Sequence, residues 1–278
     1  MLELPEAVVI SKQINEILKG KTIVNAIANS SPHKFAFYNG SSEEYANLLK
    51  GKKFVEAYSY GGMVEINFDG VCVVFTDGAN IRYFSHIKSI PAKHQMLIVF
   101  DDNSFISASI QMYGGVWCFK KGTFENKYYL GAQTKISPLS DAFDYQYFGS
   151  MINDTTVQNL SVKAFLATEQ RIPGLGNGVL QDILWNVYIN PKTKIKELSD
   201  EQRKALYHSV VSTLKSMCDQ GGRDTENNLF GKPGGYHTTL CSKTSSLFCP
   251  RCYSPISKVA YLGGSVYFCS QCQKEVKK

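Results

Sequence analysis

The sequence has no run that approaches the roughly 20 consecutive apolar residues of a membrane-spanning helix. It also has no basic leader followed by an apolar segment at its amino terminus, and no internal repeat. These absences predict a cytoplasmic protein with no membrane partner. Hydrophobic residues make up 44% of the chain, as is ordinary for a soluble globular protein. The length of 278 residues predicts two domains with room for a small third unit.

Acidic residues are scarce toward the carboxyl end. Residues 243–278 hold six lysines and arginines against one acid, Glu275, so they carry +5 of the formal net charge of +6. A basic end on a nearly neutral body favours a polyanion as the partner. A solvated tail that aids solubility is the alternative, and the charge alone does not decide between the two.

Four of the eight cysteines stand alone in apolar or helical contexts, and we expect them to be buried small hydrophobic residues: Cys72, Cys118, Cys218 and Cys241. The other four follow the spacing C-x2-C-x16-C-x2-C: Cys249, Cys252, Cys269 and Cys272. Each C-x2-C turn presents two thiolates to one ion, so this spacing predicts one structural Zn2+ with no open position for water. A disulfide framework is the alternative, which the intracellular character of the chain disfavours. With zinc bound, the charge of residues 243–278 falls to about +3.

The first half of the chain, to about residue 135, reads as β-structure. Glycine and aspartate pairs such as Gly61-Gly62 and Asp69-Gly70 have turn chemistry and separate short apolar or alternating runs. The runs predict strands at residues 53–60, 63–68, 71–75, 95–100 and 104–110. This pattern predicts an antiparallel β-sandwich or barrel with the N-terminal helix across it.

The first six residues, MLELPE, place two carboxylates beside the amino terminus. Apolar residues at helical spacing begin just after them, and Pro5 and Glu6 suit the first turn of that helix. Glu3 would lie outside the helix, near whatever the terminal amine contacts. A functional carboxylate and an ordinary disordered terminus are both open for Glu3.

The second half reads as helical. Helices are predicted at residues 161–170, 179–187 and 200–220, and Ser199 with Gln202 forms a capping box for the last. The sequence PGLGNG at 173–178 separates the first two helices. Its glycines would let backbone N–H groups approach an anion such as phosphate, although a tight connection explains them as well. No strand precedes this turn and no Gly-Lys-Ser/Thr follows it, so it is not a nucleotide-binding loop.

Four motifs occur in a fixed order along the chain: ELPE at 3–6, EQRIPGLGNGVLQDIL at 169–184, GKPGGYH at 231–237 and a four-cysteine unit ending in CSQCQK. In these motifs the chain resembles the formamidopyrimidine-DNA glycosylase and endonuclease VIII family of base-excision repair enzymes. The resemblance implies an α+β fold with three parts. These are an N-terminal β-sandwich (1–135), a helix-two-turn-helix domain (136–242) and a zinc-finger hairpin (243–278), with damaged or abasic DNA held in the cleft between the halves.

The resemblance also assigns roles to individual residues. It implies catalytic carboxylates at Glu3 and Glu6, and DNA phosphate contacts at Gly176, Asn177, Lys163 and His94. Each of these contacts has an ordinary alternative. Asn177 is well tolerated in a turn because asparagine accepts left-handed geometry, and Lys163 and His94 could be simple surface residues. Asp182, where the family commonly has glutamate, is expected to serve helix packing or orientation.

Several family positions have changed in this chain. The family proline whose secondary amine attacks the sugar C1′ is Leu2 here, and we expect Met1 to be retained before it. The family lysine aligns with Gly62, and two family arginines align with Gln111 and Gly264. The turn with an intercalating methionine is unrecognisable in residues 73–83.

Three functions follow as hypotheses. The first is a monomeric DNA glycosylase, associated with the nucleoid through DNA, that hydrolyses the N-glycosidic bond of a damaged base with weak or absent lyase activity. The second is a catalytically silent protein that binds damaged DNA on the same scaffold. The third is a zinc-stabilised module that binds protein or RNA. Glu3 favours the first, the losses at Leu2, Gly62 and Gly264 favour the second, and the PGLGNG turn disfavours the third.

Overall fold

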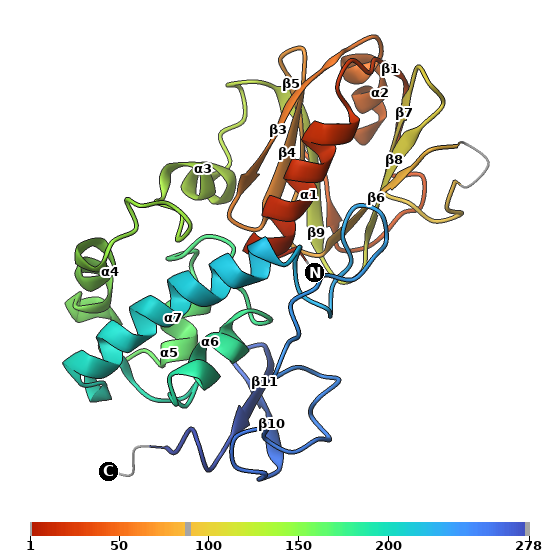
Figure 1. Ribbon diagram of the computed structural model, residues 1–278. Coiled ribbons are helices and arrows are strands. Elements are labelled where there is room, and N and C mark those ends of the chain that lie inside the picture. The colour runs from red at the N-terminus through yellow and green to blue at the C-terminus, as the bar shows by residue number, and fades with distance from the viewer. Residues whose placement is uncertain (1, 87–89, 276–278) are drawn as a thin grey trace.

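The computed structural model describes residues 2–86 and 90–275 of the chain. Figure 1 shows two lobes, an upper one of β-sheets and a lower one of helices with a small hairpin, and the N-terminus lies where they meet. The mixed α+β fold predicted from the sequence is confirmed. The expectation that Met1 is retained falls on a residue outside the described ranges.

The upper lobe is a β-sandwich of two sheets. One sheet has the order β1-β7-β8-β6, with β1 at Ile23–Ala28, β7 at Met96–Phe100, β8 at Phe105–Ile110 and β6 at Ala79–Phe84. The other has the order β2-β9-β5-β4-β3, with β2 at Ala36–Phe37, β9 at Gly114–Lys120, β5 at Val71–Phe75, β4 at Met63–Phe68 and β3 at Phe54–Tyr60. All pairs are antiparallel except β2 with β9. The five predicted strands are confirmed as β3, β4, β5, β7 and β8, and β1, β2, β6 and β9 complete the two sheets.

Helix α1 (Leu4–Ile17) runs from the junction of the lobes into the sandwich and packs against β3 and β4 (Figure 1). Its residues Ile10 and Ile14 are buried in the core between the sheets, where they meet apolar side chains such as Phe68 and Phe100. Leu2 is buried in the same core, with 3% of its surface exposed. The start of the chain is therefore held in place by apolar burial. A short helix, α2 (Tyr45–Leu49), packs beside β1.

Helix α3 (Lys127–Thr134) packs against the sandwich. The lower lobe contains four α-helices among the described residues: α4 (Tyr145–Ile152), α5 (Val162–Ala167), α6 (Leu180–Asn186) and α7 (Asp200–Asp219). Ser199 caps α7 by accepting a hydrogen bond from the Gln202 N–H, as predicted. Helix α5 ends earlier than predicted because Glu169 and Gln170 have φ values of 56° and 47°, which no α-helix accommodates. The predicted helix at 179–187 is α6.

The last described element is an antiparallel hairpin of β10 (Ile256–Tyr261) and β11 (Gly264–Cys269). It lies below α6 in Figure 1. The first predicted cysteine pair precedes β10, and the second begins at Cys269, the last residue of β11. Within residues 2–86 and 90–275, no helix combines the length and apolarity that crossing a membrane requires.

Candidate active site between the lobes

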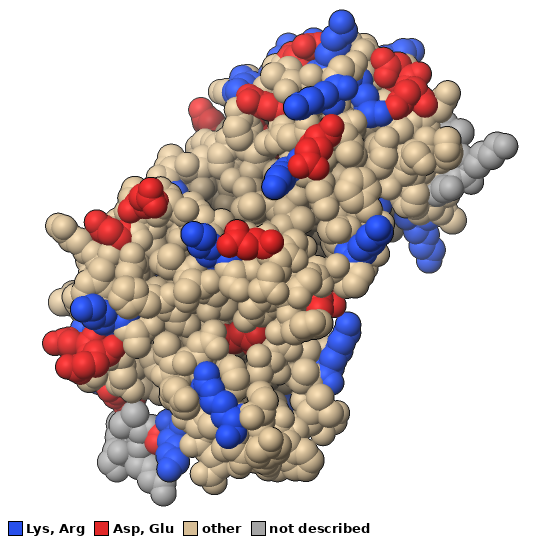
Figure 2. Space-filling view, in the orientation of Figure 1, with Lys and Arg blue, Asp and Glu red and all other residues tan. Residues whose placement is uncertain are grey.

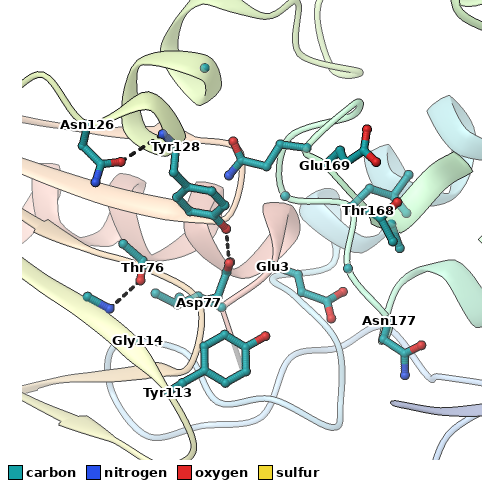
Figure 3. A pocket seen from close by; sticks show the side chains of 18 of the residues that line it. Glu3, Thr76, Asp77, Tyr113, Gly114, Asn126, Tyr128, Thr168, Glu169 and Asn177 are labelled. Carbon is teal, nitrogen blue, oxygen red and sulfur yellow. Dashed lines mark hydrogen bonds between the residues drawn. The ribbon is translucent and has the colours of Figure 1, made fainter. Parts of the chain in front are cut away.

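A cleft of about 1000 Å3 lies where the lobes meet. The start of α1, the β5–β6 turn, the β8–β9 turn and α3 line it on the sandwich side, and the PGLGNG turn and the tip of the β10–β11 hairpin line it on the other. Figure 3 shows Glu3 and Asp77 reaching into this hollow, with Tyr113, Tyr128 and Asn177 around them. The cleft therefore gathers side chains from segments that are far apart in the sequence.

The Glu3 carboxylate is held by the PGLGNG turn. Its two oxygens accept hydrogen bonds of 2.8 Å from the backbone N–H groups of Gly178 and Val179. The glycines of the turn make room for it, because a Cβ atom at residue 176 would lie 2.7 Å from the Glu3 carboxylate carbon. The turn thus binds an anion, as its sequence indicates. That anion is the side chain of Glu3, so a phosphate would have to displace Glu3 to use these two N–H groups.

Arg223 lies between the two N-terminal carboxylates. Its guanidinium is bidentate to Glu6, with nitrogen–oxygen distances of 3.0 and 2.7 Å, and it lies 3.4 Å from Glu3. All three side chains are buried. Burial raises the pKa of Glu3, and the charge of Arg223 with the two backbone N–H groups opposes that shift. Burial disfavours the charged form of Arg223, but the two carboxylates outweigh it and raise the pKa of the guanidinium.

Glu6 is thus fully engaged away from the cleft. Besides Arg223, it accepts a hydrogen bond of 3.3 Å from the Glu3 N–H, which joins the two motif carboxylates. Glu6 does not line the cleft described above. These contacts are those of a residue that positions Glu3 and Arg223. Sequence reasoning missed Arg223, and its place directly after Gly221-Gly222 at the end of α7 was the only signal for it.

Asn177 and Lys163 connect the turn to the hairpin. The Asn177 amide nitrogen donates a hydrogen bond of 2.7 Å to the Ser265 carbonyl, and the Lys163 ammonium donates to the Tyr261 carbonyl. Both residues line the cleft, as does Gly176. Burial lowers the pKa of Lys163. The structure therefore brings three of the four predicted phosphate contacts together on one wall.

His94 lies apart from that wall. Its imidazole is buried just before β7, its Nδ1 lies 3.0 Å from the Pro91 carbonyl oxygen, and it does not line the cleft. Asp182 accepts hydrogen bonds from the Thr239 and Leu240 N–H groups at 2.9 and 2.8 Å. It ties α6 to the segment before the hairpin, which is the orienting role predicted for it.

The four cysteines of the C-x2-C pairs converge beside the hairpin. Their sulfur atoms all lie within 4.8 Å of one another, with 3.9 Å between Cys249 and Cys272 and 3.4 Å between Cys252 and Cys269. A tetrahedral zinc with bonds of about 2.3 Å holds its sulfurs roughly 3.8 Å apart. All four are free thiols rather than disulfides. The donor set and its spacing therefore fit a metal ion.

Known proteins are similar to this chain. A family model described as the formamidopyrimidine-DNA glycosylase H2TH domain matches residues 135–228. The formamidopyrimidine-DNA glycosylases of Bacillus licheniformis and Bacillus subtilis are each 25% identical to this chain, over 99% and 98% of it and over 100% and 99% of their own lengths. The chain is similar to formamidopyrimidine-DNA glycosylases along its whole length and shares their H2TH domain.

Solved structures of this family share the fold. The MutM (Fpg) protein of Thermus thermophilus superposes with a TM-score of 0.81 at 19% identity, covering 99% of this chain and 100% of its own. The Lactococcus lactis Fpg in complex with DNA that contains an abasic site also gives a TM-score of 0.81 at 19% identity, covering 98% and 100%.

The structure explains two departures from the family pattern. Leu2, which replaces the family proline, buries its side chain in the sandwich core. Gly62, which replaces the family lysine, is closely packed: a Cβ atom there would lie 2.7 Å from Asp77 Oδ1 and 3.3 Å from the Leu2 carbonyl oxygen, so a side chain would require Asp77 to shift. Beside it, a Cβ atom at residue 61 would lie 2.7 Å from Pro173 and 2.8 Å from the Gly174 nitrogen of the PGLGNG turn. The sandwich and the turn thus touch where the family has its lysine.

Proposed function

We propose that this protein is a DNA glycosylase of base-excision repair, which hydrolyses the N-glycosidic bond between a damaged base and its sugar. The observation that carries the proposal is the Glu3 carboxylate on the wall of the interlobe cleft, fixed by Gly178, Val179 and Arg223. Breaking the bond leaves positive charge on the sugar, and a preorganised carboxylate stabilises that charge without having to reorganise. The similarity to formamidopyrimidine-DNA glycosylases along the whole chain supports the same reaction class.

We propose that DNA lies along the wall formed by the PGLGNG turn and the hairpin, with Gly176, Asn177 and Lys163 facing its backbone. These residues line the cleft, and Lys163 supplies a positive charge there. On the face shown in Figure 2, basic and acidic side chains are intermixed over both lobes, which does not favour that face as the DNA surface. His94 belongs to this proposal only if DNA extends over the sandwich beyond the cleft.

We propose that lyase activity is weak or absent. Strand cutting in this family passes through an imine between an enzyme amine and the sugar. Leu2 replaces the proline that supplies this amine in the family, and Gly62 replaces the lysine beside it. Hydrolysis needs neither group, because water can attack the sugar directly.

A second candidate function is a silent protein that binds damaged DNA. The observation that favours it is the close packing of Gly62 against Asp77 and the PGLGNG turn. The lysine that aligns with Gly62 in the family is absent here, and Asp77 lies where its side chain would begin. Binding needs only the phosphate contacts of the wall, so this candidate predicts affinity for lesion-containing DNA without any release of base.

A panel of duplex and single-stranded oligonucleotides with oxidised, alkylated, ring-opened and abasic lesions separates the two functions. We expect release of free base from at least one lesion, measured by chromatography under single-turnover conditions, while undamaged DNA stays intact. Undamaged DNA of the same sequence is the control. Tight binding to lesions with no base released from any of them would leave the silent protein as the function.

We propose that Cys249, Cys252, Cys269 and Cys272 hold one zinc ion, which would fix the hairpin and take no part in the chemistry, since four thiolates leave it no open position. Elemental analysis of freshly purified protein should give one zinc per chain. Cys269→Ser should lose most of that zinc, because the remaining three thiolates no longer complete the tetrahedron. Cys218→Ser, which changes a thiol in α7, should keep the full content. Equal zinc in both variants would contradict the assignment.

A further inference from the structure

Asp77 is a carboxylate in the cleft that the family resemblance does not account for. It lies in the turn between β5 and β6, within the stretch where the family has its intercalating turn, and its side chain lines the interlobe cleft. In Figure 3 it points to the Tyr128 hydroxyl, with Tyr113 and Glu3 on other sides of the same hollow. Tyr128 donates a hydrogen bond to Asp77 Oδ2.

The β5–β6 turn is rigidly tied to the β8–β9 turn. The Thr76 hydroxyl accepts a hydrogen bond of 2.6 Å from the Gly115 N–H, and the Thr76 N–H donates one of 3.1 Å to the Gly115 carbonyl. Gly78 takes a φ of 81°, which reverses the chain at a conformation that only glycine adopts freely. A Cβ atom at residue 114 would lie 2.5 Å from the Asp77 carbonyl oxygen. Asp77 is therefore held by backbone contacts on both sides.

The other carboxylate oxygen of Asp77, Oδ1, lies against Gly62, the position that aligns with the family lysine. Asp77 Oδ1 lies 2.7 Å from where a Cβ atom at residue 62 would be. Asp77 thus lies beside the position that aligns with the family lysine. A cationic group that could assist imine chemistry has been replaced by a group that can accept a proton.

We propose that Asp77 is the general base that activates water for base release, an inference that rests on the proposed glycosylase function. The water oxygen forms a bond to C1′ of the sugar as the bond from C1′ to the base nitrogen breaks. One proton of that water passes to the Asp77 carboxylate, and the base departs with the electron pair of the broken bond. The base takes up a proton from solvent and Asp77 returns its proton to solvent, so one water is consumed and no other reactant is needed.

Glu3 is the weaker candidate for this step. Both of its oxygens accept backbone N–H bonds, and Arg223 lies beside it, so its lone pairs are already engaged with donors. Such a carboxylate stabilises charge well, but its engaged oxygens leave it poorly placed to take a proton from a water. In this proposal Glu3 stabilises the positive charge that develops on the sugar, and Asp77 takes the proton from water.

The surroundings of Asp77 suit a base that works near neutral pH. Burial raises the pKa of Asp77, and the hydrogen bond from Tyr128 opposes the shift. Tyr128 of α3 and Tyr113 of the β8–β9 turn interact with it electrostatically, and Glu3 faces it across the hollow in Figure 3. Lys127, Lys135, Lys163 and Glu169 are the other charged residues among those that line the cleft. Burial and the charge of Asp77 raise the pKa of both tyrosines, so both stay neutral near pH 7. The rate of base release should fall as acid protonates Asp77.

Asp77→Asn tests the role directly. The amide still accepts from Tyr128 but cannot take a proton, so single-turnover base release should fall at least about 100-fold. Binding to duplex with a tetrahydrofuran abasic analogue, measured by fluorescence anisotropy, should stay close to that of the parent protein. Asp101→Asn, at an exposed turn that does not line the cleft, is the matched control and should keep the parent rate.

Tyr128→Phe gives a second readout that does not depend on Asp77→Asn folding. Removing the hydroxyl removes a hydrogen bond that lowers the pKa of Asp77, so the acidic limb of the rate profile should move to higher pH. An unmoved limb, or parent-like base release by Asp77→Asn, would overturn the role of Asp77 and leave the glycosylase standing. No base release by the parent protein on any lesion would overturn both.

Discussion

Arg223→Met should lower the free energy of unfolding by about 3–5 kcal/mol, because it leaves two buried carboxylates without their cation. Glu3 and Glu6 are the partners that lose it, at 3.4 and 2.7 Å. Arg223 also lies across the junction, since it follows α7 and contacts residues at the start of α1. The loss should therefore appear as a lower midpoint in urea or thermal unfolding.

The pH dependence of this variant should have a defined sign. Burial raises the pKa of Glu3 and Arg223 opposes that shift, so removing Arg223 raises the pKa of folded Glu3 further above its unfolded value. A folded-state pKa above the unfolded one gives stability that is present at low pH and is lost as the pH rises through the folded value. Relative to the parent, Arg223→Met should therefore be least stable in alkaline buffer.

Lys121→Met is the matched control. Lys121 forms an exposed pair with Glu56 at 4.0 Å, so its replacement should change the free energy of unfolding by no more than about 1 kcal/mol. A loss at Arg223 as small as the loss at Lys121 would mean that Glu3 and Glu6 are stable without the guanidinium. In that case Arg223 could not be what fixes Glu3 in the cleft.

Local sequence patterns predicted much of the fold. The strands from residues 53 to 75 were readable because short apolar runs alternate with the turn pairs Gly61-Gly62 and Asp69-Gly70, and hairpins of this kind are set by neighbouring residues. The capping box at Ser199 and the cysteine spacing were readable for the same reason. Strand β9 was missed because it begins with Gly114-Gly115, which reads as a turn, and its place is fixed by pairing with β5.

Anion binding was one of two interpretations that the sequence left open for the PGLGNG turn, and the sequence did not indicate which anion would lie there. Glycines that expose N–H groups indicate an anion of some kind. Glu3 fills that position from the far end of the chain, and only the packing of α1 against the lower lobe brings the two together. The same limit applies to Arg223, whose role depends on two residues near the amino terminus.

Asp77 shows why a carboxylate in a cleft can escape sequence reading. An aspartate before glycine is typical of a turn, and the sequence TDG carries no further signal. Its proposed role depends on its neighbours in space, Tyr128 on α3 and Gly62, which has no side chain. The absence of a lysine at Gly62 was visible in the sequence, whereas the residue that fills its space was not.

Borohydride should trap little or no covalent complex between this protein and lesion-containing DNA, even where base is released. The family nucleophile is the secondary amine of a proline at the second position, and here that position is Leu2, with its side chain anchored in the sandwich core. Any amine that precedes Leu2 is displaced by a residue from that point. A misplacement of about 1 Å can cost roughly 100-fold in rate, so strand cutting should lag base release by at least that factor.

The measurement compares three yields on one lesion: free base, cut strand before and after alkali, and protein trapped by borohydride. We expect free base and an abasic site that alkali cleaves, with a proline-bearing family member as the positive control for trapping. Gly62→Lys should not restore trapping, because its side chain would have to displace Asp77 Oδ1 and press on the Leu2 carbonyl oxygen, which should destabilise the junction. Efficient trapping with strand cleavage by the parent would mean that a primary amine reaches C1′ despite Leu2. Hydrolysis by water would then no longer be needed to explain base release, and the proposal that Asp77 activates that water would be overturned.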